Sequence, residues 1–205
     1  IKGLDYQPSS MDLKGLFIHS NVESNSSFSC SSSLLNTIQE ATLRTFQANL
    51  VSVQSDCAAR EKFGYGGDLN ATIESFIYNF DMQSFYRKTI YDWIDAMKDS
   101  SFVDTAPFTG IEYCGISWES AFILSQYYLY LYYNDTAIVK ELYALDKKWM
   151  DKAAKIHPDL LVNAGLSDHE SLSPVPVQLT GTAHYMQCAK KKKKFAACLA
   201  SNPLT

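Results

Sequence analysis

The segment from residue 118 to residue 133 is apolar or tyrosine at nearly every position, and it constrains the fold more than any other feature. Its length favours a helix over a strand, and a helix that is apolar all round must be buried on most sides. Residues 134–136 can cap a new helix, in which apolar residues recur at helical spacing up to Ile156, with lysines facing outward. A buried helix followed by an amphipathic helix is typical of an inner and outer pair in a layered α/α array.

Helical spacing of apolar residues recurs along the rest of the chain. Further predicted helices cover residues 34–53, 68–80, 86–97 and 176–200. Serines precede the first of these as a cap, Asp68 can act as the N-cap of the second, and Trp93 falls on the core side of the third. We therefore expect an all-α fold of about six helices in three hairpins.

The first thirty residues differ from the rest because glycine and proline interrupt short apolar runs. Gly3, Pro8 and Gly15 separate segments such as 16–19, which indicates a strand or an extended linker. We expect a boundary near residue 30, with the helical domain covering residues 31–205.

Charged groups are concentrated in residues 56–68, between two predicted helices. This stretch holds three carboxylates, two cations, two aromatic residues and three glycines. Glycines make backbone turns available that other residues avoid, so the carboxylates of Asp56, Glu61 and Asp68 can converge on a ligand. Glycosidic bond cleavage requires such a set, with one carboxyl group kept protonated for the leaving oxygen. A salt-bridged loop that caps the next helix is the alternative interpretation.

These residues also carry a resemblance to a known family. The pattern Asp-Cys-x-x-Arg-Glu-Lys-x-Gly-aromatic-x-Gly-Asp resembles the signature of the bacterial-type α-L-rhamnosidases, glycoside hydrolase family 78. The resemblance implies that Glu61 is the general acid and that Asp56, Arg60 and Asp68 bind the rhamnose hydroxyls. It also implies that Tyr65 packs against the sugar.

Two departures concern the details of the sugar subsite, since the family usually has Pro at Ala58 and Trp at Tyr65. A weaker likeness extends over residues 29–187. Within it, residues 104–107 and 115–119 resemble stretches that line the sugar pocket, and Trp118 is a candidate stacking residue whose alternative role is packing.

A later loop, residues 165–170, resembles a Gly-Leu-Gly-Asp-Trp stretch of the family, with His169 in place of Trp. The match would place Asp168 at the pocket. A turn in which this acid caps the following residues explains the loop equally well.

The resemblance further implies the first half of a catalytic (α/α)6 toroid, with residues 1–30 crossing from a preceding β domain. Its enzymes hydrolyse terminal α-L-rhamnose with inversion, using a general acid and a second carboxylate that activates water. We find no match for that base up to Thr205. We therefore expect the remainder of the polypeptide to supply the general base, and this segment alone to be inactive.

Composition excludes several other function classes. A net charge of −4 without a basic, aromatic-interleaved stripe argues against nucleic acid as a partner, and no apolar run is long and clean enough for a membrane span. Five widely spaced cysteines without a Cys-x-x-Cys pair indicate neither a zinc site nor a dense disulfide framework. We expect no metal or cofactor, a carbohydrate bearing L-rhamnose as the substrate, and solvated side chains for the lysines at 190–194.

Three Asn-x-Ser/Thr sequons, at Asn25, Asn70 and Asn134, favour a secreted or extracellular glycoprotein. Asn70 lies two residues after the last acid of the 56–68 stretch, so a glycan there would obstruct the site and we expect it to be unmodified. Two rival functions remain from the sequence. One is a toroid hydrolase or lyase that acts on acidic sugars, which an unsaturated product would reveal. The other is a non-catalytic carbohydrate-binding helical domain, which would bind sugar without turnover.

Overall fold

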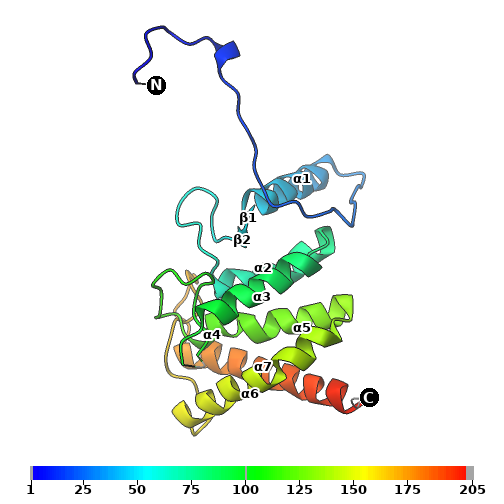
Figure 1. Ribbon diagram of the computed structural model, residues 1–205, viewed down its shortest axis with the longest axis vertical. Helices are drawn as coiled ribbons and strands as arrows, with labels where there is room; N and C mark the ends of the chain where they lie inside the picture. Colours follow the sequence, from blue (N-terminus) through cyan, green and yellow to red (C-terminus); the bar gives the residue numbers. More distant parts are fainter. Residues whose placement is uncertain (1, 100, 202–205) are drawn as a thin grey trace.

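Helices make up the body of the protein in this computed structural model, which describes residues 2–99 and 101–201 (Figure 1). The long helices are α1 (Ser33–Ala48), α2 (Gly66–Asn79), α3 (Gln83–Ala96), α5 (Ala121–Tyr133), α6 (Thr136–Ile156) and α7 (Val177–Ser201). A short helix, α4 (Ile116–Glu119), precedes α5, and a 3-10 turn covers Ser10–Asp12. The all-α prediction is confirmed. Residues 1, 100 and 202–205, which belong to the predicted linker, the loop after α3 and the end of the predicted domain, lie outside the described residues.

Helix α5 forms the centre of the helical body, where it packs against α2, α3, α6 and α7 (Figure 1). Its residues 121–127 are all buried, as expected for a helix without a polar face. At its start, the ring of Phe122 lies 4.0 Å from the ring of Phe102, centroid to centroid, and Phe102 in turn stacks on Trp149 of α6. The predicted pair of a buried helix followed by an amphipathic one is therefore confirmed.

Helices α1 and α6 begin at capping residues that the sequence predicts. Ser32 caps α1 by accepting a hydrogen bond from Leu35 N, and Asp135 caps α6 by accepting one from Ile138 N at 3.1 Å. Trp93 on α3 is 1% exposed and donates to Val103 O at 3.0 Å, so its predicted core position is also confirmed.

The prediction of a helix up to residue 53 is wrong. After α1 the chain forms two short antiparallel strands, β1 (Leu50–Val51) and β2 (Val53–Gln54), around Ser52 at φ 66°. Contacts with α2 and α3 explain the difference, because the Gln54 amide donates to Thr72 at 2.6 Å and its oxygen accepts from the Tyr86 hydroxyl at 2.8 Å. Tertiary contacts thus override a local helical preference.

The predicted N-cap of α2 is wrong as well. The helix begins at Gly66, with Tyr65 as its N-cap residue and without a capping side chain, and Asp68 lies within the first turn. In this position the Asp68 carboxylate still lies near the positive end of the helix dipole.

Three of the five consecutive lysines on α7 contact tyrosines, which corrects the prediction that the whole run is solvated. Lys191 lies 4.0 Å above the ring centre of Tyr127, whose hydroxyl accepts from Lys194 at 2.8 Å. Lys192 lies over the ring of Tyr143 and donates to its carbonyl oxygen at 2.6 Å. A run that spans more than one helical turn necessarily turns some of its members toward the neighbouring helices.

The N-terminal segment projects away from the helices and is extended apart from its 3-10 turn (Figure 1). It joins the body where Ser24 forms an antiparallel bridge with Phe80 and where Asp81 N donates to Glu23 O at 2.8 Å. Its origin in a preceding β domain stays a prediction. None of the helices in residues 2–99 and 101–201 is long and apolar enough to cross a membrane.

A buried acid links α5 and α6. Asp146 is fully buried, and its Oδ1 accepts from the Gln126 amide at 2.9 Å. Within the described residues, Asp146 Oδ2 and Gln126 Oε1 have no hydrogen-bond partner. Burial raises the pKa of Asp146 to about 7. Protonation of Asp146 removes the charge from a buried carboxyl group whose Oδ2 has no donor to stabilise it, and it makes Oδ2 a possible donor.

We expect Asp146→Asn to flatten the dependence of stability on pH. The folded protein binds this proton more tightly than the unfolded chain, so the contribution of Asp146 to the free energy of unfolding falls as pH rises from the unfolded pKa toward 7. Between pH 5 and pH 8 this contribution amounts to about 2–3 kcal/mol, and the variant should lose it in denaturant titrations at the two pH values. Asp151→Asn, which alters an exposed acid paired with Lys147 on the same helix, is the matched control. An unchanged pH dependence in Asp146→Asn would contradict the assignment.

Candidate functional site

Residues 56–68 run from the end of β2 into the first turn of α2, and their first half is a closed loop. Asp56 N donates to Phe63 O at 3.1 Å, and Asp56 Oδ1 accepts from Phe63 N at 2.9 Å. Inside the loop, Glu61 N donates to Cys57 Sγ at 3.3 Å. The two ends of the loop are therefore fixed to each other, while Arg60 and Glu61 remain exposed to solvent.

The glycines of this stretch serve close packing rather than unusual turns. Gly64, Gly66 and Gly67 are not among the positive-φ glycines of the described residues. A Cβ on Gly64 would lie 2.4 Å from Ala106 O, one on Gly66 would lie 2.1 Å from Trp118 O, and one on Gly67 would lie 2.4 Å from the Trp118 ring. The prediction that these glycines provide unusual backbone turns is wrong. They are needed because any side chain at these positions would collide with Ala106 or Trp118.

A neighbouring segment locks the second half of the stretch in place. Gly66 N donates to Asp104 O at 2.9 Å and Ala106 N donates to Gly64 O at 3.0 Å, which forms a bridge between Tyr65 and Thr105. The Asp104 carboxylate is 2% exposed and accepts from the backbone N–H groups of Cys114 and Gly115 at 2.7 and 3.2 Å. Residues 104–106 are buried behind the site and Pro107 is exposed, and none of these four residues lines the cleft that opens at the site.

Tyr65 and Trp118 form a small aromatic cluster together with Cys114. Tyr65 is 8% exposed, and burial together with the nearby Glu61 carboxylate raises its pKa to about 12. Trp118 lies over Gly67, and the exposed imidazole of His169 meets its ring edge-on with centroids 6.3 Å apart. The two predicted sugar-contacting aromatic side chains are thus adjacent, and both are largely packed, since Trp118 is 9% exposed.

The carboxylates of the stretch lie close enough to affect one another. Burial raises the pKa of Asp68, and the Asp56 carboxylate and, more weakly, the Glu61 carboxylate raise it further, whereas His169 opposes the shift. This effect requires that the Asp56 and Glu61 carboxylates lie near Asp68. The exposed Arg60 guanidinium makes no ion pair with any described residue.

A cleft of about 500 Å³ opens beside this cluster. Of the predicted site residues, Asp68 and Trp118 line it, whereas Asp56, Arg60, Glu61 and Tyr65 lie outside its lining. The loop of residues 165–170 contributes Asp168 and His169 to the lining, so this loop reaches the site as the sequence suggests.

The sequence gives no indication of two further cleft residues on α7, Thr180 and His184. His184 Nδ1 is 3.0 Å from Ser120 Oγ, 64 residues earlier in the chain, and its pKa is lowered by burial. Ser120 Oγ also accepts from the Asn70 amide at 2.9 Å, and the same amide donates to Ser117 O. This network joins α2, α4 and α7 beneath the cleft. It also engages the Asn70 side chain, which favours the prediction that Asn70 carries no glycan.

The described residues contain no group of three or more His, Cys, Asp or Glu side chains placed to hold a metal ion. The stretch of residues 56–68 and the neighbouring α4 bring carboxylates, a guanidinium and aromatic side chains to the site. Such groups can bind hydroxyls and move a proton.

Comparisons with known proteins agree on one family. The profile described as the bacterial alpha-L-rhamnosidase 6 hairpin glycosidase domain matches residues 23–203. An α-L-rhamnosidase of Formosa agariphila is 32% identical over 155 residues, which are 70% of this chain and 16% of that protein. An α-L-rhamnosidase of Streptomyces avermitilis is 25% identical over 98% of this chain and 20% of its own length.

Solved structures give the same result. The α-L-rhamnosidase from Dictyoglumus thermophilum superposes with a TM-score of 0.88 at 32% identity, over 98% of this chain and 24% of that one. The Streptomyces avermitilis α-L-rhamnosidase complexed with L-rhamnose has a TM-score of 0.84 at 24% identity, over 89% of this chain and 18% of its own, and supports the fold. The chain thus spans about a fifth of the length of the curated relatives named above.

We expect Gly67→Ala to displace the Trp118 indole, because the new Cβ would lie 2.4 Å from the ring. Overpacking of this kind lowers the free energy of unfolding by about 1–3 kcal/mol, and tryptophan fluorescence should report the altered environment. Gly15→Ala is the control, since a Cβ there has no atom within 4 Å. Unchanged fluorescence and stability in Gly67→Ala would refute this packing.

Proposed function

The chain belongs to the bacterial α-L-rhamnosidase six-hairpin glycosidase family, and from this premise we propose that the complete protein hydrolyses terminal α-L-rhamnose from glycosides or polysaccharides. The observation that carries the proposal is that Asp68 and Trp118 line one cleft, while the Asp56 and Glu61 carboxylates lie near enough to raise the pKa of Asp68. Carboxylates that flank an aromatic face are suited to a sugar ring and to acid catalysis at its glycosidic oxygen.

Glu61 is the proposed general acid. It lies on the exposed side of a loop whose ends are tied by Asp56 and Phe63, so the backbone that carries it is held in place before substrate arrives. A fixed proton donor avoids part of the entropy loss on reaching the transition state. The protonated Tyr65 hydroxyl lies near the Glu61 carboxylate, where it can stabilise the negative charge that remains after proton transfer.

The remaining residues of the stretch bind the sugar in this proposal. Asp56 Oδ1 is used by Phe63 N, which leaves Oδ2 for a rhamnose hydroxyl. Asp68 offers its carboxylate at the cleft, and the exposed Arg60 can donate to two oxygens at once. Trp118 supplies the apolar face, and Tyr65 borders it.

The second carboxylate of the reaction is proposed to come from the remainder of the polypeptide. Inversion requires a base that activates water on the opposite face of the sugar, about 6.5–9.5 Å from the acid. The chain covers 16% and 20% of two rhamnosidase relatives, so ample sequence in such proteins lies beyond the matching region.

The variant Glu61→Gln of the complete protein should lower kcat for phenyl α-L-rhamnoside by about 10²–10⁴-fold. Its deficit should be smaller with 4-nitrophenyl α-L-rhamnoside, because a better leaving group needs less protonation in the transition state. Release of the phenols measures both rates. Glu40→Gln, which alters an exposed acid on α1, is the matched control. Equal deficits for the two substrates would argue against an acid role for Glu61, and full activity would exclude it.

Inversion is tested by the anomer that is formed first. A single displacement by water converts the α-glycoside into β-L-rhamnose, so proton NMR spectra recorded within the first minutes should show the β-anomer before mutarotation. First formation of the α-anomer would indicate retention and would overturn the inverting mechanism while leaving the rhamnosidase activity in place.

A further inference from the structure

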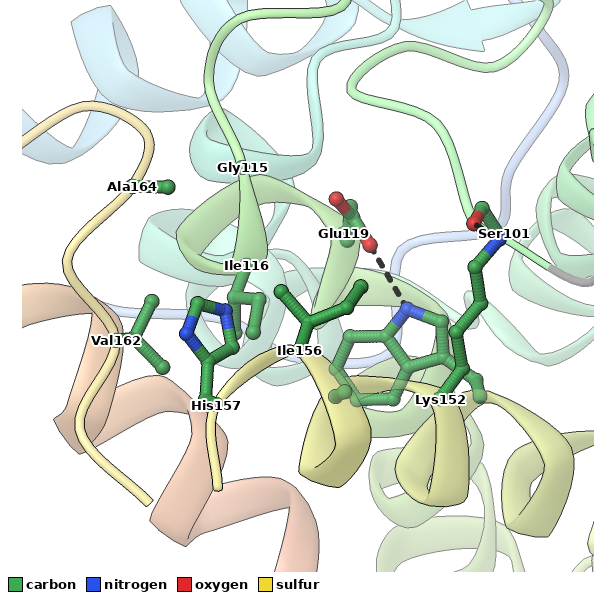
Figure 2. Close-up of a pocket in the computed structure, with 11 residues that line it drawn as sticks. Ser101, Gly115, Ile116, Glu119, Lys152, Ile156, His157, Val162 and Ala164 are labelled. Atoms are coloured by element: carbon green, nitrogen blue, oxygen red, sulfur yellow. Dashed lines mark hydrogen bonds between the residues drawn. The ribbon is translucent and has the colours of Figure 1, made fainter. Parts of the chain in front are cut away.

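A second cavity lies on the other side of α4 from the cleft. Its volume is about 190 Å³, and its wall includes Glu119, Trp149, Lys152 and His157 (Figure 2). Neighbouring residues of α4 therefore face two spaces, with Trp118 at the cleft and Glu119 at the cavity. Whatever holds Glu119 consequently also influences where α4 presents Trp118.

Glu119 bonds directly to α6. Its Oε2 accepts from the indole N–H of Trp149 at 2.8 Å, the bond drawn as a dashed line in Figure 2. Trp149 is 2% exposed and stacks on Phe102, so the donor itself is fixed by the core.

Helix α4 is held by the close packing of Gly66 and Gly67 against Trp118 and by hydrogen bonds from side chains of neighbouring helices. It is a single turn, and its N-cap residue Gly115, at φ 76°, provides no capping side chain. Besides the Glu119–Trp149 bond, Asn70 of α2 donates to Ser117 O and to Ser120 Oγ, and His184 of α7 contacts Ser120. Side chains of three helices thus anchor this turn, and one of these anchors involves an acid.

The charge of that acid changes near neutral pH. Burial raises the pKa of Glu119 to about 7, and Asp104 adds to the rise, while the Trp149 hydrogen bond and Lys152 oppose it. His157 lines the cavity at the end of α6, and His184 on α7 lies behind Ser120 with its pKa lowered by burial. An N–H bond to a carboxylate is about twice as strong as one to a neutral acceptor, and the cavity gives a protonated carboxyl group space to turn.

We propose that Glu119 is a positioning residue whose bond to Trp149 sets how α4 presents Trp118 to the cleft, and that protonation of Glu119 loosens this placement. The ionised acid holds α4 against α6. The protonated acid weakens that anchor. The Trp118 indole then samples positions in which it contacts the sugar ring less well. The consequence for substrate binding rests on the proposed rhamnosidase function, whereas the coupling between the two tryptophans does not.

The coupling is tested by fluorine NMR on the complete protein labelled with 5-fluorotryptophan. Trp118→Phe and Trp149→Phe assign the two resonances. In the parent protein both resonances should titrate with one midpoint near pH 7. Glu119→Gln, which keeps an acceptor for the indole N–H but cannot ionise, should remove that titration from both resonances. Glu112→Gln, which alters an exposed acid paired with Lys98 on the loop before α4, should leave it unchanged.

A second variant keeps the test decisive if Glu119→Gln fails to fold. In Trp149→Phe the bond through which Glu119 holds α4 is lost, so the Trp118 resonance should lose its titration near pH 7. Titration of Trp149 alone in the parent protein would overturn the coupling. Persistence of the Trp118 titration in Glu119→Gln or in Trp149→Phe would do so as well.

Enzyme kinetics separate this inference from the proposed function. KM for an aryl α-L-rhamnoside should rise about two- to fivefold from pH 8 to pH 6 in the parent, and it should not change with pH in Glu119→Gln. A parallel rise of KM in the variant would contradict the role of Glu119 in binding. Absence of any rhamnoside hydrolysis by the parent would refute the proposed function and leave the fluorine titration to decide the coupling.

Discussion

The contact between the first turn of α2 and the backbone of α4 is the constraint on which the site depends. It exists because Gly66 and Gly67 have no side chains, since a Cβ on Gly66 would lie 2.1 Å from Trp118 O. Asp68 follows these glycines on α2 and Trp118 lies on α4, so the contact places a carboxylate and an indole on one cleft. Larger residues at these two positions would separate the acid from the aromatic face even if both helices formed. The fold therefore builds the site through backbone proximity, which is less tolerant of substitution than a contact between side chains.

The stretch before α2 divides support and chemistry between different groups. Asp56 and Phe63 close the loop through two backbone-directed hydrogen bonds, and buried Asp104 fixes the segment behind it through the N–H groups of Cys114 and Gly115. Arg60 and Glu61, the charged residues proposed to act on the substrate, are left exposed. A carboxylate that accepts backbone N–H groups rigidifies the loop, and the neighbouring charged groups can then act without themselves holding the structure.

The features that the sequence predicts correctly are local, and those it misses depend on distant contacts. Helical periodicity and the caps at Ser32 and Asp135 are visible within a few residues, and the structure contains them. The candidate residues at 56–68 could also be found from their spacing, but the reason for their glycines could not, because the atoms that exclude a Cβ belong to residues 106 and 118. The strands after α1 form because Gln54 bonds to α2 and α3, and His184 reaches the cleft from α7. Both features depend on residues far apart in the chain, so no local sequence pattern could predict them.

The buried carboxylates of this domain show that the number of donors and the free space around an acid decide what it does. Asp104 accepts from two backbone N–H groups, which counteract the effect of burial on its pKa. Glu119 accepts from Trp149 and Asp146 accepts from Gln126, and burial raises the pKa of each to about 7. Asp146 is fully enclosed between α5 and α6, so its proton affects the stability of their packing. Glu119 borders a cavity and sits on the same helical turn as Trp118, so the same burial effect acts on the geometry of the cleft. Glu119 and Asp146 therefore bind a proton with similar affinity but with different consequences. Of the two, only Glu119 has space to move and a cleft residue beside it.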